Sequence, residues 1–121
     1  MIKLTFALVW RAEFTRESFQ AHWFNHHAPL VASVRQVLRI RRYVQMHSLP
    51  SEVSGALRDT RGGPAGYGGV AQLWWDSLDD VAIANTDPQA IQAACRLLED
   101  ERSFIDLARS PLWWGEEKVI F

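Results

Sequence analysis

Large apolar side chains occupy every second position of the opening segment. They are Ile2, Leu4, Phe6, Leu8 and Trp10, and smaller or polar residues separate them. A period of two residues is typical of a β-strand, whose alternate side chains point to opposite faces of a sheet. The segment therefore predicts a strand over residues 2–10 with one strongly buried face.

Three later segments predict further strands. Residues 38–47 alternate again and put Tyr43 and His47 on the same face. Residues 70–75 are apolar on both faces, which is typical of a strand that is covered from two sides. Residues 116–121 are expected to form the last strand, after a tryptophan-rich turn or bulge.

The segment that follows the first strand has helical periodicity. Thr15 can cap a helix, and a stripe at spacings of three and four residues follows it: Phe19, Trp23, His27, Leu30 and Val34. Pro29 lacks a backbone N–H and restricts the residue before it. We therefore expect a kink or break of this helix near His27.

A second helical region lies between the third and fourth expected strands. Residues 78–85 favour a short helix. Asp87 followed by Pro88 favours the start of a longer one, because Asp caps free amide groups and Pro suits the first helical position. The expected buried side of the longer helix comprises Ile91, Ala94, Cys95, Leu98, Phe104 and Ile105.

The expected elements follow one another as βαββαβ. This pattern predicts a single α+β domain over residues 1–121, with a four-stranded antiparallel sheet and helices on one face. Residues 48–69 hold two prolines and six of the seven glycines, and they are expected to form a long flexible loop. The second sheet face is too apolar for solvent, so we expect a second copy to pack against it and close a dimeric barrel.

Composition narrows the function classes. A net charge of -1 gives no general attraction to nucleic acid or to an acidic membrane surface, and no segment has the apolar length that crosses a bilayer. The single cysteine, Cys95, excludes an intrachain disulfide and fits a reducing cytoplasm. Six tryptophans favour either an aromatic-lined cavity, which would suit a flat ligand, or an interface.

Three of the four histidines lie within residues 22–27, beside the expected helix break. His27 shares the apolar stripe, and an imidazole can transfer protons near neutral pH, so His27 is the first catalytic candidate. A bond to a free backbone carbonyl at the helix break is its structural alternative. His22 and His26 are four residues apart, as two metal ligands on one helix would be, but no third ligand is close in sequence and we expect no metal.

Tyr43 is the second catalytic candidate. A phenol directed into a barrel can polarise a carbonyl or stabilise an enolate, and a place in a dimer interface is its alternative. We assign the wall that binds the substrate to aromatic and imidazole side chains, namely Trp23, His26, His47 and Trp74.

Several short motifs coincide with those of a known family. They are Met1-Ile2-Lys3-Leu4, Thr15-Arg16-Glu17-Ser18-Phe19, Trp23 followed by His27-Ala28-Pro29-Leu30, Arg42-Tyr43, Ala71-Gln72-Leu73-Trp74, the segment Asp100 to Asp106, and Glu116-Glu117. On these residues the chain resembles the EthD family of the dimeric α/β-barrel superfamily, over its whole length except residues 48–69. The resemblance implies a ferredoxin-like protomer, a homodimer, and chemistry without a defined cofactor on small aromatic or lactone-like molecules. It also maps the motif histidine of the family onto His27.

We therefore expect an enzyme that acts on a small aromatic, polyketide-like or lactone substrate by proton transfer at His27. Cofactor-independent oxidoreductase, dehydratase, decarboxylase and isomerase activities all fit this expectation. Two alternatives stay open. A small-molecule binding protein of the same fold needs the pocket but no proton transfer, and a haem-binding relative would use His26 or His27 as its axial ligand.

Overall fold

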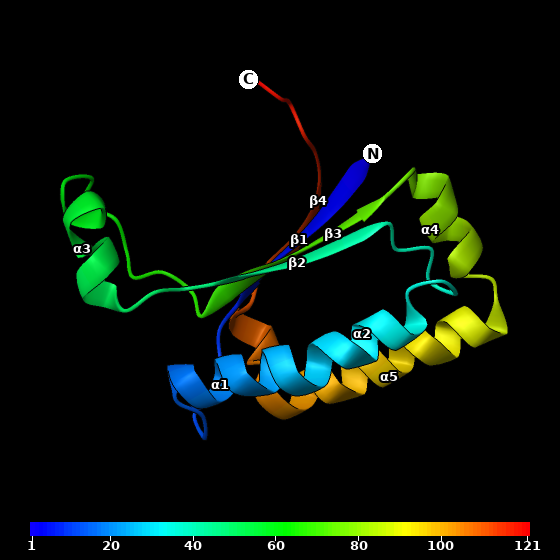
Figure 1. Cartoon of the computed structure of the whole chain (residues 1–121), viewed down its shortest axis with the longest axis horizontal. Coiled ribbons are helices and arrows are strands. Elements are labelled where there is room, and N and C mark those ends of the chain that lie inside the picture. The colour runs from blue at the N-terminus through cyan, green and yellow to red at the C-terminus, as the bar shows by residue number, and fades with distance from the viewer.

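The computed structural model describes residues 1–121 and contains a four-stranded sheet with helices against one of its faces (Figure 1). The strands are β1 (Ile2–Leu8), β2 (Arg42–His47), β3 (Gly69–Trp75) and β4 (Leu112–Glu116). The helices are α1 (Arg16–His22), the π-helical turn η1 (Trp23–His27), α2 (Ala28–Val34), α3 (Ser51–Asp59), α4 (Leu78–Ala84), α5 (Pro88–Phe104) and the short 3-10 turn η2 (Leu107–Arg109). This order confirms the expected α+β class.

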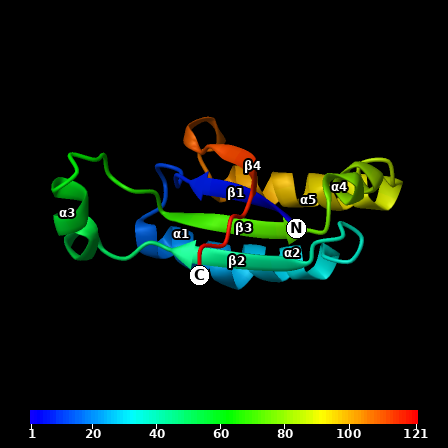
Figure 2. The ribbon, with the colours of Figure 1, turned by 90° about the horizontal axis from the view of Figure 1, so that it is seen from above.

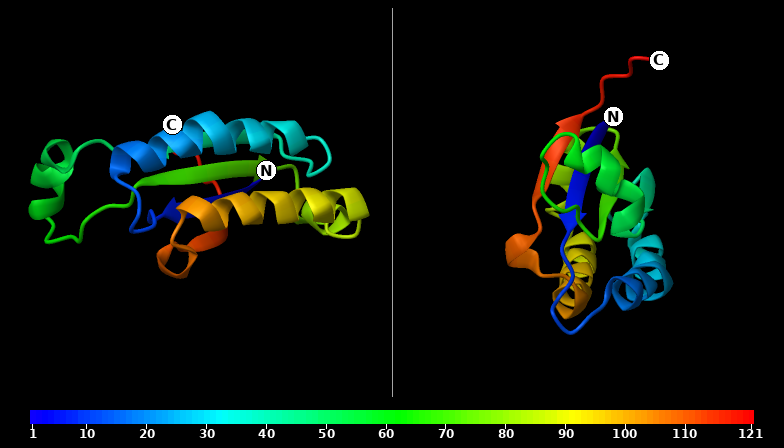
Figure 3. Two further views of the ribbon diagram at one scale, coloured as in Figure 1. Left: turned by 90° about the horizontal axis from the view of Figure 1, so that it is seen from below. Right: turned by 90° about the vertical axis from the view of Figure 1, so that its left-hand side faces the viewer.

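The strand order in the sheet is β2-β3-β1-β4, and every neighbouring pair is antiparallel. The register places Leu4, Leu73 and Tyr43 side by side in one row, and Trp74 lies in the next row. Because side chains alternate along a strand, the first row faces the helices and the second faces away from them. Figure 3 shows that α1, α2 and α5 lie on the same side of the sheet, so the opposite face carries no helix.

The segment α1–η1–α2 winds continuously past the expected break. Thr15 caps its start, since the Thr15 side chain accepts the Ser18 N–H and the Ser18 hydroxyl accepts the Thr15 N–H. Instead of a break before Pro29, the structure has the π-helical turn η1, in which the Ala28 N–H donates to the Trp23 carbonyl. The wider turn offsets the backbone where the Pro29 ring would meet the preceding turn, so the helix continues as α2.

The main core lies between the sheet and these helices. Its largest fully buried side chains come from β1, α1, η1 and α5: Leu8, Phe19, Trp23 and Phe104. Gly69, at the start of β3, is required by this packing. A Cβ atom on Gly69 would overlap the ring of Trp23 and the carbonyl oxygen of Met46.

The last strand differs from the sequence-based expectation. β4 comprises the residues expected to form a turn or bulge, whereas residues 117–121 continue as an exposed tail. Pairing with β1 determines which residues form the last strand, because Leu112 lies opposite Phe6 and Trp114 lies opposite Leu4. This register aligns the apolar positions of β4 with those of β1, and no such partner exists for the tail.

Helix α3 lies within the segment that was expected to be a long loop. None of its residues is buried, and it stands away from the sheet and the other helices (Figures 1 and 2). The glycines of residues 62–69 dominate the sequence pattern of this segment. The preceding residues nevertheless include Glu, Ala, Leu and Arg, which favour a helix.

Two smaller expectations also differ from the structure. β2 begins at Arg42 and not at residue 38, because Arg39 adopts a left-handed φ of 60° and turns the chain. The buried residues of α5 are Ala90, Ala93 and Phe104, whereas four residues expected on its buried side are exposed: Ile91, Ala94, Cys95 and Leu98. The longest helix, α5, has 17 residues, and no helix has the length and apolar character needed to cross a membrane.

Candidate active site

A cavity of about 240 Å³ lies between the sheet and the helices. Its wall is mainly apolar and includes Leu4, Phe6, Leu73, Trp75, Leu97 and Trp114. Besides three tryptophans, the wall includes four residues with polar side-chain groups: His27, Tyr43, Asn85 and Glu101. An apolar cavity with a few polar groups is the usual form of a site for a small molecule.

His27 comes from the π-helical turn η1 and is only 6% exposed. Its Nδ1 lies 2.7 Å from Oδ2 of Asp100 on α5. A carboxylate only accepts hydrogen bonds, so Nδ1 carries the ring proton and Nε2 is left as the basic nitrogen. Nε2 makes no hydrogen bond within the protein. Because no fully buried side-chain nitrogen lacks a partner, Nε2 is not fully buried. The His27 side chain is also part of the cavity wall. Burial lowers the pKa of His27, and the hydrogen bond to Asp100 opposes that shift.

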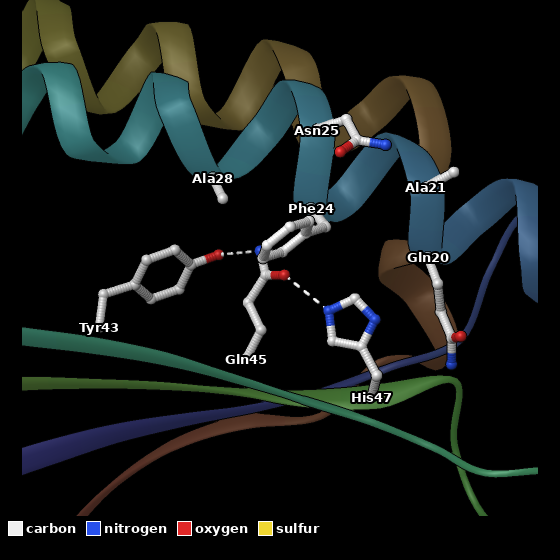
Figure 4. Close-up of a pocket in the computed structure, with 8 residues that line it drawn as sticks. All are labelled: Gln20, Ala21, Phe24, Asn25, Ala28, Tyr43, Gln45 and His47. Carbon is white, nitrogen blue, oxygen red and sulfur yellow. Dashed lines mark hydrogen bonds between the residues drawn. The ribbon is translucent and has the colours of Figure 1, made fainter.

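Tyr43 faces the helices from β2 and is held by Gln45 (Figure 4). The amide of Gln45 donates to Tyr43 Oη at 2.7 Å and to the Trp23 carbonyl at 2.9 Å. The Gln45 carbonyl accepts a hydrogen bond from His47 Nε2 at 2.8 Å. Tyr43, Gln45 and His47 are alternate residues of β2, so their side chains lie on the same face of the strand. Burial raises the pKa of Tyr43 to about 12, so the phenol keeps its proton at neutral pH.

Tyr43 also borders an open groove of about 570 Å³ between β2 and the helical segment (Figure 4). The helical side of the groove is formed by Gln20, Ala21, Phe24, Asn25 and Ala28. His47 forms part of its other side and stacks on the Trp23 ring, with 4.5 Å between the ring centroids. Tyr43 therefore belongs to the walls of both the groove and the cavity. Trp23 belongs both to the cavity wall and to the core.

Glu101 is a cavity residue that the sequence did not single out. Its side chain lines the cavity, and burial together with the charge of Asp100 raises the pKa of its carboxyl to about 7. The one feature of the sequence that could have pointed to Glu101 is its place directly after Asp100. Neighbouring residues on a helix point about 100° apart, so when Asp100 bonds to His27, Glu101 can reach a different surface.

The other two histidines of the cluster also meet Asp100. His22 Nε2 lies 3.2 Å from Oδ1 of Asp100, and His26 Nε2 lies 3.3 Å from the same oxygen. His26 is exposed on the outer side of the helix and lines neither the cavity nor the groove. Asp100 is 78 residues from His22 in the chain, which is why no third partner was visible in the sequence.

Trp74, expected in the substrate-binding wall, is placed on the sheet face that points away from the cavity. Its ring lies between two cations, with Lys3 Nζ at 5.0 Å and Arg42 Cζ at 4.6 Å from the ring centroid. Its indole N–H also donates to Glu117. The tryptophans that line the cavity are Trp23, Trp75 and Trp114.

The fold and the cavity define a ferredoxin-like α+β protein with an apolar site between its sheet and its helices. The sequence model of the EthD domain matches residues 11–108, and the chain therefore belongs to the EthD family. No curated protein matches the chain in sequence.

Solved structures agree with this assignment of the fold. An ethyl tert-butyl ether D (EthD) family protein from Bacillus halodurans aligns with a TM-score of 0.62 at 20% identity, over 98% of this chain and 100% of that one. A dimeric protein of unknown function and ferredoxin-like fold from Bacteroides fragilis aligns with a TM-score of 0.59 at 13% identity, over 96% and 95%. A mutant of SnoaB, a cofactor-independent oxygenase from Streptomyces nogalater, aligns with a TM-score of 0.53 at 14% identity, over 98% and 93%.

Proposed function

We propose that the protein is an enzyme that binds a small aromatic, polyketide-like or lactone molecule in the cavity and transfers a proton through His27. The observation that carries the proposal is the hydrogen bond from His27 Nδ1 to Asp100, made by a ring that also lines the cavity. This bond leaves Nε2 as the unprotonated nitrogen, which can take a proton from a bound ligand. In this proposal the step needs no cofactor.

The other polar groups of the cavity suit the charge that such a step creates. Removal of a proton next to a carbonyl puts negative charge on the carbonyl oxygen. Tyr43 accepts a hydrogen bond from Gln45, which leaves its own phenolic hydrogen for that oxygen. Glu101 offers a second donor in its protonated form, and the Asp100 carboxylate stabilises the imidazolium that forms on His27.

The cavity favours a small, flat ligand. Its volume of about 240 Å³ lies below the range of about 300–1,000 Å³ that is usual for drug-sized molecules. Trp75 and Trp114 lie in the wall with 5.2 Å between their ring centroids, and they offer aromatic surface to a ring of the ligand.

The comparisons support an enzymatic role for this fold, since SnoaB is described as a cofactor-independent oxygenase. For the present chain we propose the wider class of cofactor-independent oxidoreductase, dehydratase, decarboxylase or isomerase. A binding protein without turnover is the second candidate. The mainly apolar wall favours it, because such a cavity can hold a ligand whether or not a proton is transferred.

The test begins with the ligand that tag-free protein carries through purification, identified by mass spectrometry. Turnover of that ligand is then measured in EDTA for the native protein, His27→Gln and the matched surface variant His26→Gln. We expect His27→Gln to lose about 100-fold or more in kcat and His26→Gln to keep full activity. Full turnover by His27→Gln would refute the proposed role, and ligand recovered unchanged from the native protein would favour the binding protein.

We also propose that two copies form a homodimer through the sheet face that carries no helix. Met46 and Trp113 lie on this face and are 55% and 50% exposed. Further apolar side chains that the protomer leaves exposed are found on α3 and in the tail: Val53, Leu57, Val119, Ile120 and Phe121. A second copy would bury such a surface, and the Bacteroides fragilis protein of the same fold is described as dimeric.

A further inference from the structure

We propose that His22, His26 and Asp100 form a binding site for a first-row divalent cation, best matched by zinc, on the outer side of the helices. None of the three residues lines the cavity. The proposed site therefore lies outside the cavity, although Asp100 also bonds to the cavity residue His27. Its occupancy does not depend on the proposed enzymatic function.

The distances between the three ligand atoms fit a zinc ion. All three atoms lie within 4.8 Å of one another. Oδ1 of Asp100 is 3.2 Å from His22 Nε2 and 3.3 Å from His26 Nε2. A tetrahedral zinc ion with bonds of about 2.0 Å separates its ligand atoms by about 3.3 Å. Two of the three separations thus have the required length, and rotation of the exposed His26 ring can adjust the third.

Two of the ligands are held in place and the third is free to adapt. The Asp100 side chain is 11% exposed and the His22 side chain 27% exposed. The His22 ring also packs on Phe104, with 4.5 Å between the ring centroids. The His26 side chain is 64% exposed, which gives a hydrated cation access and leaves room for water as a further ligand.

The donor set determines the class of cation. Two imidazole nitrogens and one carboxylate oxygen suit zinc and its first-row neighbours, whereas magnesium and calcium prefer oxygen ligands alone. Arg96 and Glu99 line a shallow hollow next to Asp100, and their opposite charges leave the cation little net repulsion.

The bond between Asp100 and His27 is compatible with an occupied site. His27 Nδ1 bonds to Oδ2 and His26 Nε2 approaches Oδ1, while His22 Nε2 lies 3.2 Å from Oδ1 and 3.3 Å from Oδ2. A cation bound through Oδ1 would leave Oδ2 to His27. A carboxylate that binds a metal through one oxygen commonly accepts a hydrogen bond from a neighbouring group, which fixes its orientation. The cation would therefore share one carboxylate with the cavity histidine.

Calorimetric titration of zinc chloride into tag-free protein, first freed of metal with EDTA and then dialysed, tests the proposal. We expect one zinc ion per chain and a rise in melting temperature on binding. His26→Ala, which removes an exposed ligand, is expected to weaken zinc binding at least about 100-fold. Loss of a group that only hydrogen-bonds to a metal ligand usually has a smaller effect. Asp100→Asn is expected to abolish binding. The matched control Glu99→Gln removes a neighbouring charge but no ligand and is expected to bind as the native protein does.

Three results would overturn the proposal. Absence of zinc binding to the native protein would mean that the contacts are only ion pairs between the histidines and Asp100. Equal binding by the native protein, His26→Ala and Asp100→Asn would place any zinc elsewhere, for example at the exposed Cys95. A loss in Glu99→Gln as large as that in His26→Ala would mean general attraction to acidic groups.

Discussion

Asp100 Oδ2 lies 2.7 Å from His27 Nδ1 and joins α5 to the π-helical turn η1. This one contact fixes the tautomer and the orientation of a buried histidine whose other nitrogen makes no hydrogen bond within the protein. It also links the cavity to the outer pair His22 and His26, which meet the same carboxylate.

Replacement of Asp100 by Asn removes the charge that fixes the His27 tautomer. Because the wrong tautomer offers a proton where a base is needed, we expect kcat to fall by about 100-fold or more with little change in KM. Steady-state kinetics in EDTA on the ligand identified by mass spectrometry would measure this. Glu99→Gln is the control that removes the preceding charge of α5, and an unchanged kcat in Asp100→Asn would contradict the account.

Glu101→Gln is expected to change how stability depends on pH. The pKa of Glu101 is about 7 in the folded protein and higher than the usual 4.5, so the folded state binds the proton more tightly than the unfolded state. The stability that this group contributes is therefore present below pH about 4.5 and lost as pH rises through about 7. The difference in free energy of unfolding between Glu101→Gln and the native protein should therefore change in favour of the variant as pH rises from 5 to 8, by up to about 3 kcal/mol.

Urea unfolding of both proteins in EDTA, at several pH values across this range, would measure that difference. The same series on Glu99→Gln controls for a general effect of removing a carboxylate from α5. A difference between Glu101→Gln and the native protein that stays constant with pH would show that the Glu101 pKa is not raised.

Gly69→Ala tests the close packing of η1 on β3. The added Cβ would overlap the Trp23 ring and the Met46 carbonyl oxygen, and neither the ring nor the backbone can move aside without disturbing the core. We expect a loss of about 1–3 kcal/mol or more in the free energy of unfolding. Gly66→Ala is the matched control, since nothing lies within 4 Å of its Cβ position. Equal stability of the two variants would argue against the close approach of Trp23 to β3.

Light scattering at micromolar concentration tests the dimer. We expect a mass of about twice the 13.8 kDa of one chain. Met46→Lys puts a charge on the sheet face that carries no helix and is expected to shift the protein to the monomer without loss of helix content. Asp79→Lys, on the exposed side of α4, is the control for the added charge. A native protein with the mass of one chain would refute the dimer.

The local pattern of the sequence predicts those elements whose signals lie within the element itself. β1 and β3 follow from their apolar side chains, and the start of α5 follows from Asp87, whose side chain accepts the Gln89 N–H. The position of His27 on the buried stripe is also local information. The last strand was expected at residues 116–121 and lies at Leu112–Glu116, because its position depends on pairing with β1, more than a hundred residues away in the chain.

The candidate site was predictable only in part, for the same reason. Tyr43 and His27 could be proposed from periodicity and from the family resemblance, but their partners lie far away in sequence. Asp100 is 73 residues from His27, and the role of Glu101 depends on which surface α5 turns toward the sheet. The proposed metal site likewise needs Asp100, which joins His22 and His26 only when α5 packs beside η1.

The most direct test of the central claim is the tautomer of His27, measured by nitrogen-15 NMR of histidine-labelled protein in EDTA, with the signal assigned from His27→Gln. We expect that Nδ1 carries the proton, that Nε2 is unprotonated, and that the Nε2 signal moves when the cavity ligand is added. A His27 protonated at Nε2 with a bare Nδ1, or an Nε2 signal that the ligand leaves unchanged, would contradict it.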